Sequence, residues 1–284
     1  MKKSQTFRRI LFFIFFFFCS KTFLQAQFGL EIIKSNSDTL KSQQHFIEIK
    51  SLQNELFDTA TYIGSEKVEI KYRFFKPNKI NTKKYPLVIV FHGSGQIGND
   101  NISQLGILPK LFAYEKIQKK YPAFVLAPQF ASRSSDYSLD SSRNILASKP
   151  RPFLNSTVEL IDSLVNHLNI DKKRIYLVGY SMGASTTINA LSARPDFFAA
   201  GISIAGIPEF DNIDKLREIP IWLIHGMEDE VNSISSDEKF YEELKRFNKI
   251  RFWKLEATNH LNIFQLPIIG EALPKWLFKQ KRKF

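Results

Sequence analysis

Residues 176–184 read YLVGYSMGA, an apolar run that ends in the pattern G-x-S-x-G around Ser181. The apolar part predicts a buried strand, and the following segment, 182–194, has the apolar spacing of a helix. A serine at such a junction lies in a strained turn that exposes its hydroxyl, whereas an ordinary glycine-flanked serine needs neither element. We therefore expect Ser181 to be a nucleophile, with the backbone N–H of Met182 as one donor to a developing oxyanion.

A serine hydroxyl becomes a strong nucleophile when a base takes its proton, and the chain has five histidines. His260 stands in a loop after the last predicted strand, at the end of the sheet where the nucleophile also emerges, so we expect it to be the base. His45 and His167 are expected at the surface. His92 and His225 each end a predicted strand before a glycine, a placement that suits a role in organising backbone.

The acid that orients the base should follow another strand, and the segment 225–231, HGMEDEV, offers three carboxylates. Asp229 is the expected one, because the spacing H-G-x-x-D-x-V lets the chain turn once after the strand before it presents the acid. Glu228 and Glu230 remain alternatives, and otherwise they form a solvated acidic turn. A second oxyanion donor is expected in the loop HGSG, residues 92–95, where we favour the backbone of Ser94.

The rest of the chain predicts an α/β domain. Residues 55–76 alternate in polarity around a Gly64-Ser65 turn signal, which predicts an antiparallel hairpin. Short apolar runs then alternate with helical segments, which is typical of a mostly parallel central sheet with helices on both faces. The expected strands are 86–91, 123–127, 174–179, 199–205, 219–224 and 250–255, and the expected helices are 103–120, 157–168, 182–194 and 236–248. Residues 131–150 are expected to form a long loop, and residues 27–54 are too irregular to place.

The N-terminus predicts export. Basic residues precede an apolar run at 10–18, and a small-residue stretch ends at Ala26. Nine apolar residues extend only about 13 Å as a helix, against a hydrocarbon core of about 30 Å, so a stable membrane span is disfavoured. We expect residues 1–26 to be a signal peptide, 27–54 a separate segment and 55–284 the catalytic domain of a secreted or periplasmic protein. A lipid anchor at Cys19, the one cysteine, is the less favoured alternative.

Composition narrows the class of function. With 44% hydrophobic and 24% charged residues the chain is globular, and without Cys19 it has no thiol for disulfides, catalysis or metal binding. The net charge is +12, and without residues 1–26 it is +7, from 35 basic and 28 acidic residues. The basic residues recur as pairs at 83–84, 119–120 and 172–173 and as a cluster at 279–283. They indicate solvated surface or adhesion to anionic glycans, and no nucleic-acid motif accompanies them.

Several motifs together resemble a known family. They are HGSGQIGNDN at 92–101, APQ at 127–129, the G-x-S-x-G turn, HGMED at 225–229 and NH at 259–260. Over about residues 60–280 the chain is similar to secreted bacterial α/β-hydrolases related to feruloyl esterases and carboxylesterases, whose catalytic residues follow the same order along the chain. Gln96 stands where many of these proteins have glutamate, so a charge at that position is not carried over.

The resemblance implies hydrolysis of a carboxylic ester through an acyl-enzyme, without a metal or organic cofactor. The implied substrate is a small molecule or a feruloylated or acetylated polysaccharide fragment, and the oligomeric state stays open. Tyr137, Phe153 and Phe210 are candidates for the wall of its pocket. A serine peptidase of the prolyl-oligopeptidase type is the first alternative, although no N-terminal segment here is long enough for a propeller. A catalytically silent binding protein with the same fold is the second.

Overall fold

The computed structural model describes residues 28–34, 39–77, 83–266 and 268–283. Its core is a nine-stranded sheet in the order β1-β11-β10-β9-β8-β4-β5-β3-β2. The strands from β1 to β5 in this order are mutually parallel, and β3 and β2 continue the sheet as an antiparallel pair. The strand bounds are β1 Gly29–Ile33, β2 Asp58–Ile63, β3 Glu69–Phe75, β4 Tyr85–Phe91, β5 Phe124–Gln129, β8 Ile170–Tyr180, β9 Ala200–Ile204, β10 Ile221–Gly226 and β11 Ile250–Leu255.

The expected hairpin at 55–76 and the six expected parallel strands are confirmed. The hairpin turns at Gly64, whose N–H donates to the carbonyl of Val68 over 3.1 Å. Every residue of β4, β5, β9 and β10 is buried, which explains why these strands read as continuous apolar runs rather than alternating ones.

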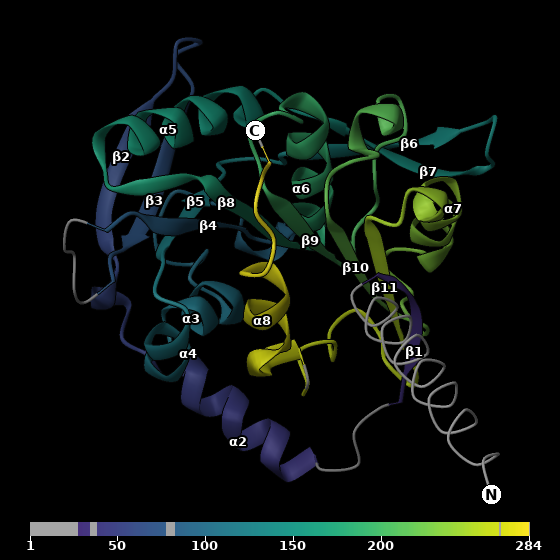
Figure 1. The fold of residues 1–284 in the computed structure, drawn as a ribbon, viewed down its shortest axis with the longest axis horizontal. Helices are drawn as coiled ribbons and strands as arrows, with labels where there is room; N and C mark the ends of the chain where they lie inside the picture. Colours follow the sequence, from purple (N-terminus) through teal and green to yellow (C-terminus); the bar gives the residue numbers. More distant parts are fainter. Residues whose placement is uncertain (1–27, 35–38, 78–82, 267, 284) are drawn as a thin grey trace, which may run out of the picture.

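Helices cover both faces of the sheet (Figure 1). The helix bounds are α2 Thr39–Lys50, α3 Ile107–Ala113, α4 Glu115–Lys120, α5 Phe153–His167, α6 Met182–Ala193, α7 Ile234–Leu244 and α8 Leu273–Leu277. Apolar side chains of α5, α6 and α7 form one core cluster with the sheet, and those of α2, α3, α4 and α8 form the other. The prediction of a single helix at 103–120 is wrong in one respect. The segment forms two helices, because extended backbone at Tyr114 separates α3 from α4.

The prediction of a long loop at 131–150 is also wrong. These residues form a separate two-stranded antiparallel sheet, with β6 at Ser135–Asp140 and β7 at Ile145–Pro150. The hairpin does not show the usual apolar alternation because it packs on α6 through polar groups. Ser135 and Ser148, for instance, bind the side chain of Asn189 over 2.9 and 3.0 Å.

The segment that the sequence left unplaced belongs to the same sheet. β1 lies parallel to β11 at the sheet edge, and α2 packs against α3, so residues before position 55 are part of this fold. A five-residue edge strand has too little apolar pattern to be recognised alone. The expected signal peptide, its cleavage after Ala26 and Cys19 lie outside the described residues. Among the described helices, none has the length and apolarity needed to cross a bilayer.

Candidate active site

The site lies at the carboxyl end of β8, between β4 and β9 in the middle of the sheet. From β4 the chain continues to β5 on one side, whereas from β8 it continues to β9 and β10 on the other. A crevice forms at the point where the strand order reverses in this way, outside the carboxyl ends of the strands. Loops that follow β8, β10, β11 and β4 can therefore meet there.

Ser181 occupies a strained turn between β8 and α6. Its φ of 55° and ψ of −121° lie outside the regions that residues with a Cβ prefer, and its N–H donates to the carbonyl of Ile204 over 2.9 Å. A Cβ at Gly179 would lie 2.0 Å from the carbonyl oxygen of Gly183, and one at Gly183 would lie 2.2 Å from that of Phe91. Both glycines of the G-x-S-x-G pattern are thus required by close backbone packing.

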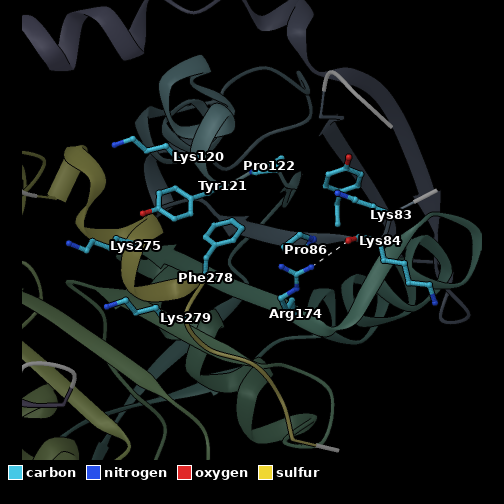
Figure 2. A pocket seen from close by; sticks show the side chains of 11 residues that line it. Lys83, Lys84, Pro86, Lys120, Tyr121, Pro122, Arg174, Lys275, Phe278 and Lys279 are labelled. Atoms are coloured by element: carbon cyan, nitrogen blue, oxygen red, sulfur yellow. Dashed lines mark hydrogen bonds between the residues drawn. The ribbon is translucent and has the colours of Figure 1, made fainter. Parts of the chain in front are cut away.

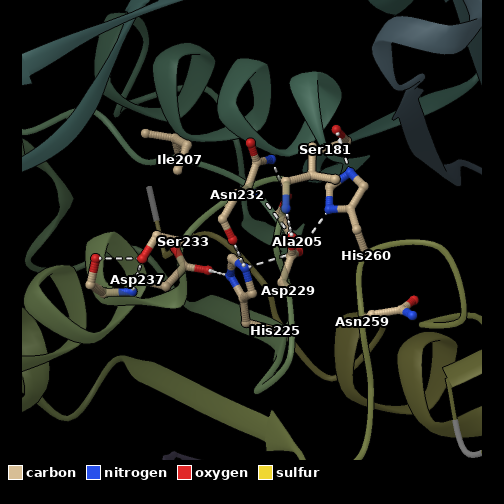
Figure 3. Close-up of polar contacts among 12 residues, drawn as sticks. Ser181, Ala205, Ile207, His225, Asp229, Asn232, Ser233, Asp237, Asn259 and His260 are labelled. Carbon is tan, nitrogen blue, oxygen red and sulfur yellow. Dashed lines mark hydrogen bonds and ion pairs between the residues drawn. The ribbon is translucent and has the colours of Figure 1, made fainter.

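Three side chains expected from the sequence meet at this turn (Figure 3). The Oγ of Ser181 lies 2.9 Å from Nε2 of His260, and Nδ1 of His260 lies 2.7 Å from Oδ2 of Asp229. Ser181 and His260 are only 7% and 6% exposed, so water has little access to this hydrogen-bonded chain. The alternatives Glu228 and Glu230 are exposed.

Asp229 is held as an anion by the turn that carries it. Its Oδ1 accepts hydrogen bonds from the N–H groups of Val231 and Asn232 over 2.9 and 2.8 Å. Burial acts to raise the pKa of Asp229, but hydrogen bonds from His225, His260 and Asn232 outweigh it and hold the pKa below its usual value. The carboxylate therefore stays ionised and can accept a hydrogen bond from Nδ1–H of His260.

His225 is a member of the site that the sequence did not reveal. As expected, it binds backbone, with Nε2 2.9 Å from the carbonyl of Asn232, but it also contacts two carboxylates. Nε2 lies 3.2 Å from Oδ2 of Asp229, and Nδ1 lies 2.7 Å from Oδ2 of Asp237. Burial acts to lower the pKa of His225, yet hydrogen bonds to these two carboxylates raise it to about 9. A fully buried imidazolium therefore lies behind the acid (Figure 3).

Tyr180 holds the backbone of His260 in place. Its hydroxyl donates to the carbonyl of His260 over 2.8 Å, and the two rings lie 5.1 Å apart. Burial raises the pKa of Tyr180 to about 12, so the hydroxyl keeps its proton for this bond. The loop itself is closed by Asn259, whose Oδ1 accepts from the N–H groups of Leu261 and Asn262 over 3.0 Å each.

The loop after β4 packs directly against the turn that carries the nucleophile. His92, Gly93 and Tyr180 line one small pocket, and the carbonyls of Phe91 and His92 lie against Gly183. Burial lowers the pKa of His92 to about 4, so its ring is neutral. Its Nδ1 donates to the carbonyl of Gly93 over 2.8 Å, and its Nε2 accepts from the N–H of Phe130 over 3.0 Å. The backbone-organising role expected of His92 agrees with these contacts.

The two expected oxyanion donors each begin a helix. Met182 is the first residue of α6, and Ser94 is the first residue of a 3-10 helix at Ser94–Gln96. The first N–H groups of a helix have no acceptor within it, so both amides are available to an anion. The carbonyls of Phe91 and His92, which precede Ser94 in this loop, lie against Gly183 of α6.

Gln129 anchors the rest of this loop, and it belongs to the APQ motif noted in the sequence. Its Oε1 accepts from the N–H of Asn101 over 2.6 Å, and its Nε2 donates to Oδ1 of Asp100 over 2.7 Å and to the carbonyl of Gln96 over 3.3 Å. The loop is thus fixed by neutral and acidic groups that do not depend on a charge at Gln96.

The remaining candidates from the sequence are dispersed. Tyr137 lies beside the site, since its hydroxyl accepts from Ser185 of α6 over 3.2 Å. Phe153 packs on Phe130, and Phe210 is 3% exposed and packs on the core residue Phe240, so Phe210 does not form a pocket wall. His167 is exposed, as expected. His45 departs from the expected surface position, because it is half-buried and its Nε2 lies 3.0 Å from the carbonyl of Ile269.

The arrangement can transfer a proton from a hydroxyl to an imidazole and stabilise an anion nearby. These are the parts of nucleophilic acyl transfer. Within the part of the chain that the structure describes, no three His, Cys, Asp or Glu side chains are grouped so as to hold a metal ion.

Known proteins share this architecture. The model of the prolyl oligopeptidase family matches residues 153–261, a segment that contains Ser181, Asp229 and His260. The solved structure of a thermostable esterase is 31% identical, with a TM-score of 0.72, and the match covers 80% of this chain and 64% of that one. The chain has the α/β-hydrolase fold.

Two curated relatives are similar over shorter segments. A bifunctional acetylxylan esterase/xylanase of Neocallimastix patriciarum is 35% identical over 82 residues, which are 29% of this chain and 12% of that protein. Acetylxylan esterase A of Emericella nidulans is 30% identical over 95 residues, which are 34% of this chain and 31% of that protein. The chain thus spans less than a third of the length of either relative. Both relatives are named as esterases of acetylated xylan.

Proposed function

We propose that this protein is a serine hydrolase that cleaves carboxylic esters through an acyl-enzyme. The observation that carries the proposal is the hydrogen-bonded chain from Ser181 through His260 to Asp229, with distances of 2.9 and 2.7 Å. It begins at a strained strand-to-helix turn, where such strain is characteristic of a functional residue. The esterase relatives support the same reaction class.

The reaction follows from the contacts. Ser181 Oγ attacks the acyl carbon while its proton passes to Nε2 of His260, and the N–H groups of Met182 and Ser94 bind the resulting oxyanion. His260 then gives the proton to the leaving alcohol, which leaves an acyl ester on Ser181. A water molecule then attacks the acyl carbon while one of its protons passes to Nε2 of His260. His260 returns this proton to Ser181 Oγ as the ester bond to Ser181 breaks and the acid leaves. Asp229 accepts a hydrogen bond from Nδ1–H of His260 throughout, which fixes the ring, and it stays ionised.

The proposed substrate is an acetyl ester on a polysaccharide fragment. The names of the two curated relatives point to the same acyl group, and a feruloyl ester is the second choice. Comparing p-nitrophenyl acetate with longer esters, methyl ferulate and acetylated xylan tests this choice.

A peptidase is the second candidate, and the match to the prolyl oligopeptidase family model is the observation that favours it. Such an enzyme has the same catalytic groups but cleaves amides. Turnover of aminoacyl p-nitroanilides at rates above those of matched esters would favour this candidate over an esterase. A catalytically silent protein would instead fail to react with a fluorophosphonate at Ser181.

The N-terminal pattern supports a further part of the proposal, that the protein is exported to the periplasm or beyond. Basic residues followed by the apolar run at 10–18 and by Ala26 are the supporting features. N-terminal sequencing of the protein recovered from outside the cytoplasm tests it, with Gln27 expected as the first residue. An uncleaved protein in the cytoplasm would contradict it.

Two substitutions test the catalytic assignment. Ser181→Ala and His260→Ala should each lower kcat for p-nitrophenyl acetate by about four to six orders of magnitude, since the triad acts as a unit. Thermal unfolding should show that both variants stay folded. Ser185→Ala is the matched control, because this buried serine lies one turn further along α6 and should retain activity within about tenfold. Full activity of Ser181→Ala or His260→Ala would refute the proposal.

A further inference from the structure

A second pocket lies at the end of the sheet opposite Ser181. It has a volume of about 460 Å³, within the range of about 300–1,000 Å³ that is typical of ligand sites. Its walls come from the starts of β4 and β8, the turn before β5 and the segment around α8. The lining residues are Lys83, Lys84, Tyr85, Pro86, Lys120, Tyr121, Pro122, Arg174, Lys275, Phe278 and Lys279.

Basic groups that are dispersed in the sequence gather in this pocket. Six of its lining residues are lysine or arginine, and none of the lining residues is acidic. They include the pair at 83–84, one member of the pair at 119–120 and one member of the cluster at 279–283. The sequence does not reveal this cluster, because its residues are far apart in the chain. The starts of neighbouring parallel strands come together only in the folded sheet.

Nearby acids neutralise only part of this charge. Lys120 pairs with Glu271 over 2.5 Å, and Arg174 pairs with Asp171 over 2.7 Å. Lys84, Lys275 and Lys279 also contribute positive charge and have exposed side chains. The concave surface between them concentrates a positive potential, which attracts anions.

Aromatic rings lie between these cations. Tyr121 and Phe278 are half-buried, with ring centroids 5.4 Å apart, and Figure 2 shows them with lysines on both sides. Pro86 and Pro122 complete the apolar part of the wall. Flat rings pack against the apolar faces of a sugar ring, while ammonium and guanidinium groups bind carboxylates or sulfates.

We propose that this pocket binds an anionic oligosaccharide, in which carboxylate or sulfate groups are carried on sugar rings. A membrane surface fits less well, since the site is hollow and none of the large exposed apolar side chains of the described residues lines it. Arg174 lies in β8, seven positions before Ser181, which corresponds to roughly 23 Å of extended chain. The bound glycan therefore anchors the protein without contacting the catalytic groups, so the proposal is independent of the proposed function.

Calorimetric titration of the full chain with the Ser181→Ala substitution tests the proposal without turnover. The probes are trigalacturonate, its methyl-esterified form and a heparin hexasaccharide, and the first and third distinguish carboxylate from sulfate. We expect at least one of these two to bind, and the neutral ester to bind at least tenfold more weakly. The affinity should also fall at least tenfold when NaCl rises from 50 to 300 mM.

A matched pair of double variants locates the binding. Lys84→Gln with Lys279→Gln should weaken binding at least tenfold. Lys239→Gln on α7 with Lys245→Gln just after it removes the same charge and should change binding less than twofold. With Ser181 intact, the pocket variant should keep its kcat for p-nitrophenyl acetate. Equal weakening in both double variants overturns the proposal. The proposal is also overturned if neither anionic sugar binds. It is overturned as well if only single-stranded DNA or anionic vesicles bind in a way that depends on the pocket residues.

Discussion

His225 Nε2 lies 3.2 Å from Oδ2 of Asp229, the same carboxylate oxygen that contacts Nδ1 of His260. The proposed acid is thus placed between two imidazole rings. One ring belongs to the proposed base, and the other is buried, cationic and held from behind by Asp237. The orientation of Asp229 depends on both.

We predict that His225→Gln lowers kcat about 10- to 100-fold. The substitution removes a hydrogen bond from a charged donor to Asp229, and such a bond contributes about 1.5–3 kcal/mol. KM for p-nitrophenyl acetate should change little, because His225 does not reach the substrate. His225→Ala serves as a second variant, and partial recovery of its kcat with added imidazole would support a positioning role. An unchanged kcat in both variants would contradict it.

The same residue should make stability depend on pH. The folded pKa of His225, about 9, lies above the ordinary value of 6.5, so its contribution to stability is complete below about pH 6.5 and is lost as the pH rises through about 9. Urea unfolding at pH 6.0, 7.5 and 9.5 should show the stability difference between the wild type and His225→Gln shrinking by on the order of 2–3 kcal/mol. A difference that stays constant across this range would exclude the effect.

The close contact at Gly183 leads to a third prediction. A Cβ there would lie 2.2 Å from the carbonyl oxygen of Phe91, so Gly183→Ala must push α6 away from β4. We expect a loss of about 1–3 kcal/mol or more in unfolding free energy, together with a fall in kcat, because the β4 loop moves with the strand. Gly95→Ala is the control, since nothing lies within 4 Å of a Cβ at that position. Equal melting temperatures for the two variants would argue against this account.

The amide of Ser94 can be tested apart from its side chain. Ser94→Pro removes the N–H and should lower kcat about 10²- to 10³-fold, as loss of one oxyanion donor does elsewhere. Proline suits the first position of a short helix, and Gly93 before it has φ −75° and ψ 171°, which proline tolerates. Ser94→Ala keeps the amide and should stay within about twofold of the wild type. If Ser94→Pro has the same kcat as Ser94→Ala, Ser94 is not an oxyanion donor.

The central sheet could be predicted from sequence because each buried strand is a short apolar run with a helix after it. The positions of Ser181, Asp229 and His260 could be anticipated because each residue follows a strand end within a short motif. The bond between His225 and Asp237 could not, because it depends on how α7 packs against β10. β6 and β7 could not be predicted because their inward side chains form hydrogen bonds with hydroxyl and amide groups of α6. Their sequences therefore lack the apolar alternation by which strands are recognised.

The attachment of the β6–β7 hairpin also bears on how the substrate range of such proteins can change. The hairpin shares no strand with the nine-stranded sheet, and its contacts with α6 are largely between polar side chains. Its length and tip can therefore vary without exposing the apolar core. Because the hydroxyl of Tyr137 in this hairpin contacts Ser185, one turn beyond Ser181, exchange of the hairpin would alter the surroundings of the proposed site while the main sheet stays intact.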